Sequence, residues 1–213
     1  MLRKTILRRF VSSHIAPRFP EFHFFGGVDL VRLCRPLLHG IVFEPSQWND
    51  DFYVTCFVDF LTSRKDYLSI GFGERMRRTD GQGDTFWVKC HEEEAQMLFQ
   101  AMRSSVFSPF NLKPTCRRMI ELSNIDEKSA HGLFDIGACA ILENDPGMAR
   151  KCFSRAKLRI GMPEFDWDKR LLNDITQVES GLDDLAATQV LLRGWVEETI
   201  RMLGLTRLDR LVV

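Results

Sequence analysis

The spacing of apolar residues changes near residue 90, and this change limits the folds that the chain can adopt. Apolar residues alternate with others in 52–60, which is the period of a half-buried strand, and recur every three or four residues in 133–141, as in an amphipathic helix. The sequence predicts an α+β fold: a first helix, an antiparallel sheet of about four or five strands, and a helical bundle. We expect a sheet region at 1–105 and a helical region at 106–213, packed as one unit because the link between them is short.

Turn and capping residues set the expected limits of each element. Gly26-Gly27 indicates a tight turn between two short strands. Asn124 or Asp126 is expected to cap the fourth helix, and Asp183 the last one. The expected strands are two within 22–34, then 38–45, 51–61, 67–73 and 86–88, and the expected helices are 2–15, 92–105, 115–123, 126–143, 146–159, 164–180 and 184–203.

Charge and cysteine usage narrow the class of protein. The chain carries 29 basic and 29 acidic residues, so its net charge does not favour nucleic acid as a partner. Low net charge leaves self-association, as a homodimer, open. Six cysteines without C-x-x-C spacing predict reduced, buried thiols and a cytoplasmic location. No apolar run is long enough to span a membrane, and no signal peptide is recognisable.

The first predicted helix is basic and amphipathic. Ile6 and Phe10 fall on one face, whereas Lys4, Arg8 and Arg9 lie mostly elsewhere. Apolar stripes of this kind usually face a core, so we expect the helix to dock on the sheet. Contact of its basic face with nucleic acid or a membrane is the alternative.

No known catalytic signature is present. The run Gly71–Met76 begins like a dinucleotide fingerprint, but Met76 stands where the third glycine belongs. The phosphate-binding, zinc-protease and nucleophile-elbow motifs are missing, and the five histidines are scattered. The sequence therefore predicts no catalytic residue, no cofactor and no metal site.

Two polar segments are the predicted partner-binding sites. One is a turn with a tryptophan and two aspartates, which would supply an aromatic anchor and charges that speed association. The other is an arginine-rich loop that would bind an acidic partner or simply be solvated. The predicted residues are Trp48, Asn49, Asp50, Asp51, Arg75, Arg77 and Arg78.

The segment 130–163 resembles one tetratricopeptide helical hairpin. Small residues would let the two helices approach, and Phe153 would fill the groove between them. Gly161 stands where proline is usual, and no second copy follows at the repeat length of that family. The matching residues are Leu133, Gly137, Ala140, Ala149, Phe153 and Ala156.

A larger part of the chain resembles an uncharacterised family of bacterial cytosolic proteins. The motifs are Phe52-Tyr53-Val54, Phe57-Val58, Leu61, Leu68, Phe72-Gly73-Glu74-Arg75, Trp167, Leu171-Leu172, Leu191, Trp195 and Leu203-Gly204-Leu205. The resemblance implies an α+β fold and a bacterial source, and it transfers no active site. Small bacterial proteins of this architecture often look like immunity proteins, which block a toxin.

These observations lead to three functional hypotheses. The first is a non-catalytic protein-binding protein, in its most specific form a toxin-immunity protein that occludes its partner. The second is an enzyme with a small-molecule site between sheet and helices, using groups such as Tyr53, His39, Cys90 and His91. A deep pocket with two or more titratable groups within hydrogen-bond reach would favour it. The third is nucleic-acid or membrane contact through the first helix.

Overall fold

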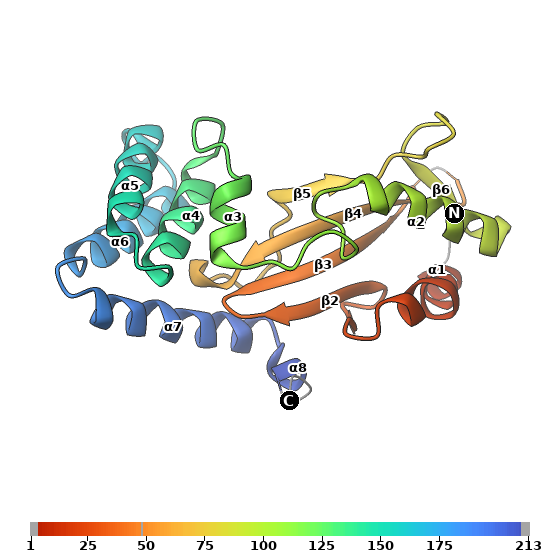
Figure 1. Ribbon diagram of the computed structural model, residues 1–213, viewed down its shortest axis with the longest axis horizontal. Helices are drawn as coiled ribbons and strands as arrows, with labels where there is room; N and C mark the ends of the chain where they lie inside the picture. The colour runs from red at the N-terminus through yellow and green to blue at the C-terminus, as the bar shows by residue number, and fades with distance from the viewer. Residues whose placement is uncertain (1–3, 48, 210–213) are drawn as a thin grey trace.

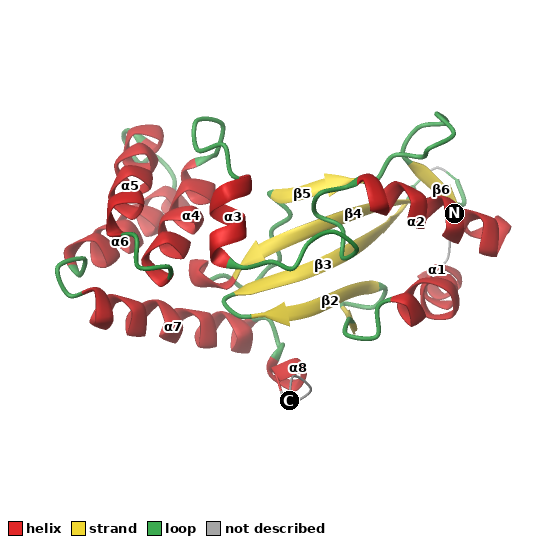
Figure 2. Ribbon diagram, viewed as in Figure 1, coloured by secondary structure: helices red, strands yellow, loops and turns green. Residues whose placement is uncertain are grey.

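The computed structural model of the chain describes residues 4–47 and 49–209; for Cys90 and Asp209 it describes the backbone alone. It confirms the α+β fold, with a first helix, an antiparallel sheet and then helices (Figures 1 and 2). None of the described helices is both long and apolar enough to cross a lipid bilayer. The strands are β1 (His23–Phe25), β2 (Asp29–Cys34), β3 (Leu37–Pro45), β4 (Asp51–Phe60), β5 (Phe72–Arg75) and β6 (Thr85–Trp87), and the α-helices are α1 (Lys4–Phe10), α2 (His91–Ser104), α3 (Cys116–Leu122), α4 (Ala130–Leu142), α5 (Pro146–Ile160), α6 (Asp166–Ser180), α7 (Leu185–Met202) and α8 (Thr206–Asp209).

The sheet is a meander in which every pair of strands is antiparallel. Strands β1 to β5 are neighbours in sequence order, and β6 also pairs with β4. The β3–β4 hairpin is the longest ladder, with Leu37 opposite Phe60 at one end and Pro45 opposite Phe52 at the other. β5 and β6 pair with different parts of the same edge of β4. The strands expected at 38–45 and 51–61 and the two short strands around Gly26-Gly27 are therefore confirmed.

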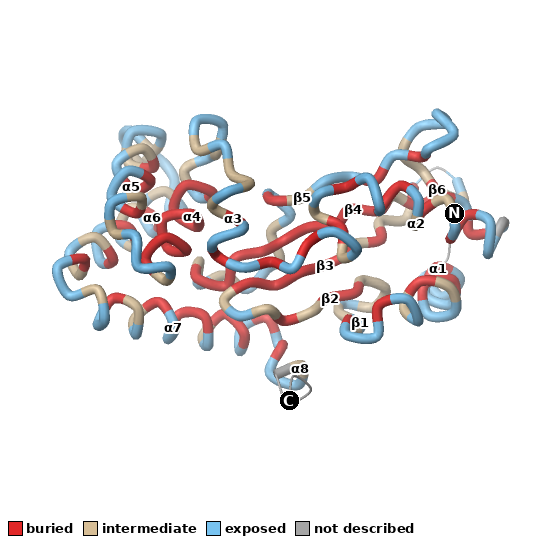
Figure 3. The backbone as a smooth tube through the Cα atoms, viewed as in Figure 1, coloured by how far each residue is buried: buried red, intermediate tan, exposed pale blue. Residues whose placement is uncertain are grey.

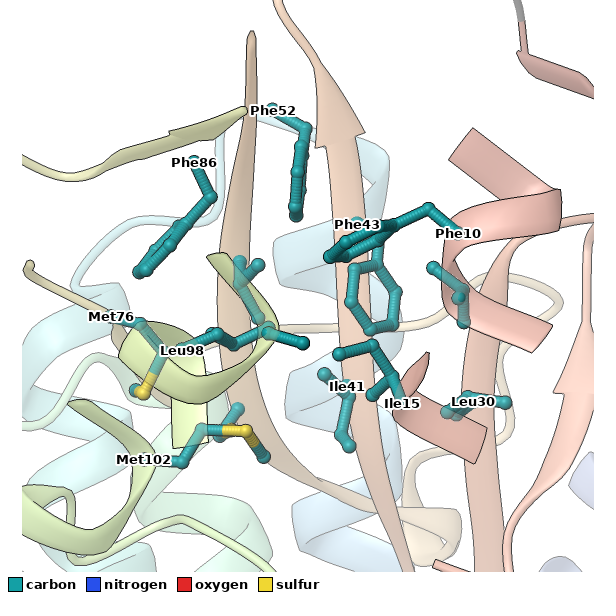
Figure 4. Close-up of a cluster of buried hydrophobic side chains, with 14 of the residues drawn as sticks. Phe10, Ile15, Leu30, Ile41, Phe43, Phe52, Met76, Phe86, Leu98 and Met102 are labelled. Atoms are coloured by element: carbon teal, nitrogen blue, oxygen red, sulfur yellow. The ribbon is translucent and has the colours of Figure 1, made fainter. Parts of the chain in front are cut away.

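The first helix docks on the sheet, as its apolar stripe predicts. α1 continues as a π-helical turn, η1 (Val11–Ile15), and Phe10 and Ile15 are buried against Phe43 of β3 and its neighbours (Figure 4). α2 packs on the same cluster through Leu98 and other residues. The prediction that Ile6 shares this face with Phe10 is wrong: Ile6 is 48% exposed, and Leu7 is buried with Phe10 instead.

Apolar clusters join the sheet to the helices on both faces. The buried parts of the strands and helices are red in Figure 3. Val58 and Phe60 of β4 share one cluster with Met119 of α3 and Ile136 of α4. On the other face, residues of β2 and β3 pack against the end of α7, including Ile200. The core therefore crosses the boundary expected at residues 105 and 106.

Three local predictions are corrected. The strand expected at 67–73 is displaced to Phe72–Arg75, because 64–71 crosses the end of the sheet as an irregular segment in which Ser69 N–H binds Asp59. The fourth helix starts at Ala130, because Ser129 accepts the N–H of Gly132, whereas Asn124 closes a separate turn with Asp126. The N-cap of α7 is Asp184, which accepts the N–H of Ala187.

The helices α4 and α5 approach each other closely where the small residues stand. A Cβ atom at Gly137 would lie 2.4 Å from the ring of Phe153, so only glycine leaves room for that ring. Phe153 also stacks on Phe134 of α4, with ring centroids 5.9 Å apart. This is the packing expected for 130–163; kinship with tetratricopeptide repeats stays a prediction.

Candidate functional site

A cleft of about 510 Å³ lies where the end of the sheet meets the helices. One wall is the segment that follows β4, including the 3₁₀ turn η3 (Leu61–Ser63), and the others are α4, α6 and α7. In Figure 1, α4 and α6 lie beyond one end of the sheet, and α7 runs from them to that end. The lining residues are Ser63, Arg64, Lys65, Asp66, Tyr67, Ser69, His131, Phe134, Asp135, Trp167, Arg170, Leu171, Asn173, Asp174, Glu198 and Met202.

Two buried carboxyl groups lie near each other in this region: Asp135 lines the cleft, and Asp59 lies behind the lining residues Lys65 and Ser69, which it contacts. Asp59 of β4 is 1% exposed and Asp135 of α4 is 7% exposed. Asp59 accepts the backbone N–H groups of Phe60 and Ser69, both at 2.9 Å, and forms an ion pair with Lys65. Within the described residues Asp135 accepts one hydrogen bond, from the Ser63 hydroxyl. Asp59 therefore has three partners and Asp135 has one among the described residues.

The pKa values follow from this difference in environment. Burial raises the pKa of the Asp135 carboxyl to about 7; Lys65 and the Ser63 hydroxyl oppose the rise, and the charge of Asp59 adds to it. Burial also raises the pKa of Asp59, against the opposing effect of Lys65. A carboxyl group with a strongly raised pKa inside a cleft is typical of a functional site.

Arg64 fastens the segment after β4 to the helices. Its backbone is left-handed, with φ 35° and ψ 62°, which is unusual for a residue other than glycine. Its guanidinium forms an ion pair with Asp174 of α6 and lies 4.2 Å from the ring centre of Trp195 of α7. One side chain thus links three walls of the cleft.

Large apolar side chains stand exposed around the mouth of the cleft. Tyr67 is 61% exposed, Trp167 57% and Met202 41%, and they come from the segment after β4, from α6 and from α7. Trp167 stacks on Phe165 with ring centroids 4.4 Å apart. The mouth is therefore aromatic and solvent-accessible, whereas Asp135 in the cleft wall is buried.

A second hollow, of about 430 Å³, contains part of the predicted partner-binding turn. Asn49, Asp50 and Asp51 line it together with Trp87 and Lys89. Asn49 donates a hydrogen bond of 2.7 Å to Asp51, and Lys89 forms an ion pair of 3.0 Å with Asp50. Hydrogen bonding by Lys89 lowers the pKa of Asp50. Trp48, the predicted anchor, lies outside the described residues.

The three predicted arginines have different environments. Arg78 is buried, and its guanidinium lies 2.7 Å from both Asp80 and Glu94 and 4.8 Å from the ring centre of Trp87. Arg78 therefore forms ion pairs within the protein, and the prediction that it is solvated in a loop is wrong. Arg75 is exposed over the Tyr53 ring, and Arg77 is exposed as well.

Glu94→Gln tests this internal role of Arg78. Glu94 is 3% exposed and also accepts the backbone N–H of Trp87 at 3.0 Å. Loss of its charge should lower the free energy of unfolding by about 1.5 to 3 kcal/mol, the range for hydrogen bonds to charged groups. Urea denaturation measures the change. Glu93→Gln, an exposed neighbour in the same helix, is the control; an equal loss there would contradict the assignment.

The groups considered for an enzyme from the sequence do not line this cleft. His39 is buried, and its Nε2 lies 2.8 Å from the Phe107 carbonyl oxygen. Burial lowers the pKa of His39 to about 4, so it is a neutral packing residue near pH 7. His91 stacks on His14 beside α1, and the side chain of Cys90 lies outside the description.

The sequence analysis missed the cleft, although one signal was present. Asp135 is the only charged residue in 132–141, a stretch that is otherwise apolar or glycine. A carboxyl group there must be buried, and buried charges are rare unless paired or functional. Among the described residues no group of three or more His, Cys, Asp or Glu side chains is placed to hold a metal ion.

Three comparisons with known proteins found no match to the chain. No model of a protein family matches the chain, and searches of the curated proteins and of the solved structures find no match.

Proposed function

We propose that the chain is a non-catalytic protein-binding protein and that the cleft receives a segment of its partner. The supporting observation is that Tyr67, Trp167 and Met202, from three separate elements, surround one charged cleft and remain exposed. Aromatic residues and methionine are enriched at protein interfaces, and a few such anchors supply most of the binding energy. Exposed side chains of this size lose the most water when a polypeptide covers them.

The charges in the cleft suit recognition of a polypeptide. Arg64 and Lys65 are already held by Asp174 and Asp59, so the walls are fixed before a partner arrives. A pre-organised site binds with less loss of conformational entropy than a mobile one. A toxin-immunity protein is one form of this function; in that form the partner is a toxin and occlusion is the mechanism.

One observation favours a second candidate, an enzyme with a small-molecule site in the same cleft. The pKa of Asp135 is about 7, and the hydroxyl of Ser63 is hydrogen-bonded to it. A carboxyl group that titrates near the working pH is suited to general acid–base catalysis. In this candidate Asp135 exchanges a proton with the substrate, and Tyr67 and Trp167 hold the substrate's apolar part.

Trp167→Ala tests the protein-binding proposal. We expect peptides selected from a phage-displayed random library to bind the wild-type chain and to bind Trp167→Ala at least about tenfold more weakly, the loss typical of an aromatic anchor. Isothermal titration calorimetry with the synthetic peptides measures the affinities.

Leu158→Ala is the matched control for this experiment. Leu158 is 81% exposed on α5 and does not line the cleft, so its removal should leave the affinities unchanged. Failure to select any peptide, or selection of peptides that bind Trp167→Ala as tightly as the wild type, would overturn the proposal.

A further inference from the structure

Asp135 and Lys65 in the cleft wall, together with Asp59 behind them, form a buried set with more negative than positive charge. Asp59 and Asp135 are both buried, and Lys65 is the one cation that acts on both of them among the described residues. Its ammonium is placed on Asp59. When all three groups are ionised, this buried set has a net charge of −1. Such a charge is costly away from water unless a proton or another cation neutralises it.

The other charged groups that line the cleft do not supply that cation. Arg64 is held by Asp174 and by the Trp195 ring. Arg170, on α6, is exposed. His131 lies one turn before Asp135 on α4, and burial lowers its pKa, so it is neutral near pH 7. Of the remaining lining residues, Asp66 and Glu198 are acidic and none is basic.

The aromatic side chains in the walls suit a cation as well. Phe134 neighbours Asp135 in α4, and Tyr67 and Trp167 stand at the mouth. Ring faces attract ammonium and guanidinium groups, and an interaction that is partly removed from water contributes more. A buried carboxylate and aromatic rings in the walls of one cleft are a general arrangement for binding the end of a basic side chain.

We propose that this cleft binds a cationic side chain, a guanidinium or an alkylammonium, of the partner polypeptide, with Asp135 as its counter-ion. The inference rests on the proposed function and specifies the chemistry of the segment that enters. The second carboxylate oxygen of Asp135, Oδ2, would accept the N–H groups of the ligand, while Ser63 keeps the carboxylate in place through Oδ1. Bonds between two charged groups are roughly twice as strong as neutral ones.

The test uses single capped amino acids, so that it does not depend on finding the partner. Nα-acetyl-arginine amide, Nα-acetyl-lysine amide, the neutral citrulline analogue and Nα-acetyl-glutamate amide are titrated at pH 8 into the full chain. The readout is the indole N–H signal of Trp167 in a two-dimensional NMR spectrum, assigned with Trp167→Phe. We expect the arginine or lysine compound to shift this signal and to bind at least about tenfold more tightly than the neutral and acidic compounds.

Two variants separate the buried carboxylate from general negative charge. Asp135→Asn should weaken the cationic ligand at least about tenfold, whereas Asp183→Asn, which removes an equal charge from an exposed site outside the cleft, should change the affinity less than about threefold. Equal binding of the citrulline analogue, or unchanged binding by Asp135→Asn, would overturn the inference. If the capped amino acids fail but library peptides still depend on Trp167, the inference is wrong and the proposed function stands.

Discussion

Asp135→Asn is expected to make the protein more stable at pH 8, by about 2 to 4 kcal/mol. Burial raises the folded-state pKa of Asp135 from 3.8 to about 7, and each pKa unit corresponds to about 1.4 kcal/mol. The folded chain therefore binds more protons than the unfolded chain between these pH values. The stability associated with Asp135 is fully present below pH 3.8 and is lost as the pH rises through about 7. Asparagine keeps the shape and cannot ionise, so the variant lacks this loss.

Urea denaturation between pH 3 and pH 8 measures this effect. The two proteins should have similar free energies of unfolding at the acidic end and should diverge as the pH rises. The variant keeps Asp59, whose pKa is also raised, so a smaller fall should remain. Asp183→Asn is the control, because the Asp183 side chain is 97% exposed, and it should follow the wild-type profile. A constant difference between wild type and Asp135→Asn at every pH would contradict the assignment.

Phe153→Ala is expected to lower the free energy of unfolding by about 3 to 5 kcal/mol, the range for removing a buried phenylalanine. Phe153 is fully buried, fills the space above Gly137 and stacks on Phe134. The resulting cavity cannot close easily, because Gly137 has no side chain to move into it. Phe134 also lines the cleft, so the loss should loosen one wall of the candidate site.

The midpoint of urea denaturation, at an unchanged dependence on urea, measures this loss. Leu158→Ala in the same helix is the matched control; at 81% exposure it should change the free energy by less than about 0.5 kcal/mol. A loss below about 1 kcal/mol for Phe153→Ala would show that α4 and α5 do not depend on this ring.

The effect of Asp135 on stability and its proposed role as the counter-ion of a cationic ligand are connected. Ionised Asp135 lowers stability near pH 8 and lines a cleft, as a group that binds a ligand there would. Binding of a cation would return the lost free energy, so a ligand that recognises Asp135 should also stabilise the chain. Active and binding sites commonly carry such locally unfavourable groups.

The sequence correctly predicted those elements whose structure depends on residues close together in the chain. The alternation in 52–60 placed β4, and Gly137 with Phe153 indicated the close approach of α4 and α5. The strand expected at 67–73 was predicted wrongly because a contact with a distant residue overrides the local pattern. Its residues alternate as a strand would, but hydrogen bonding of Ser69 to Asp59 turns the segment across the end of the sheet.

The sequence by itself determined the division into sheet and helices, because strand and helix periods are local consequences of backbone geometry. It also marked Asp135 as a charge in an apolar helix. Only the tertiary structure decided what that charge faces: Ser63 lies 72 residues away, and Trp167 belongs to another helix. Packing of the helices against the end of the sheet brings these residues together. The spacing of these residues in the sequence does not predict that they line one cleft.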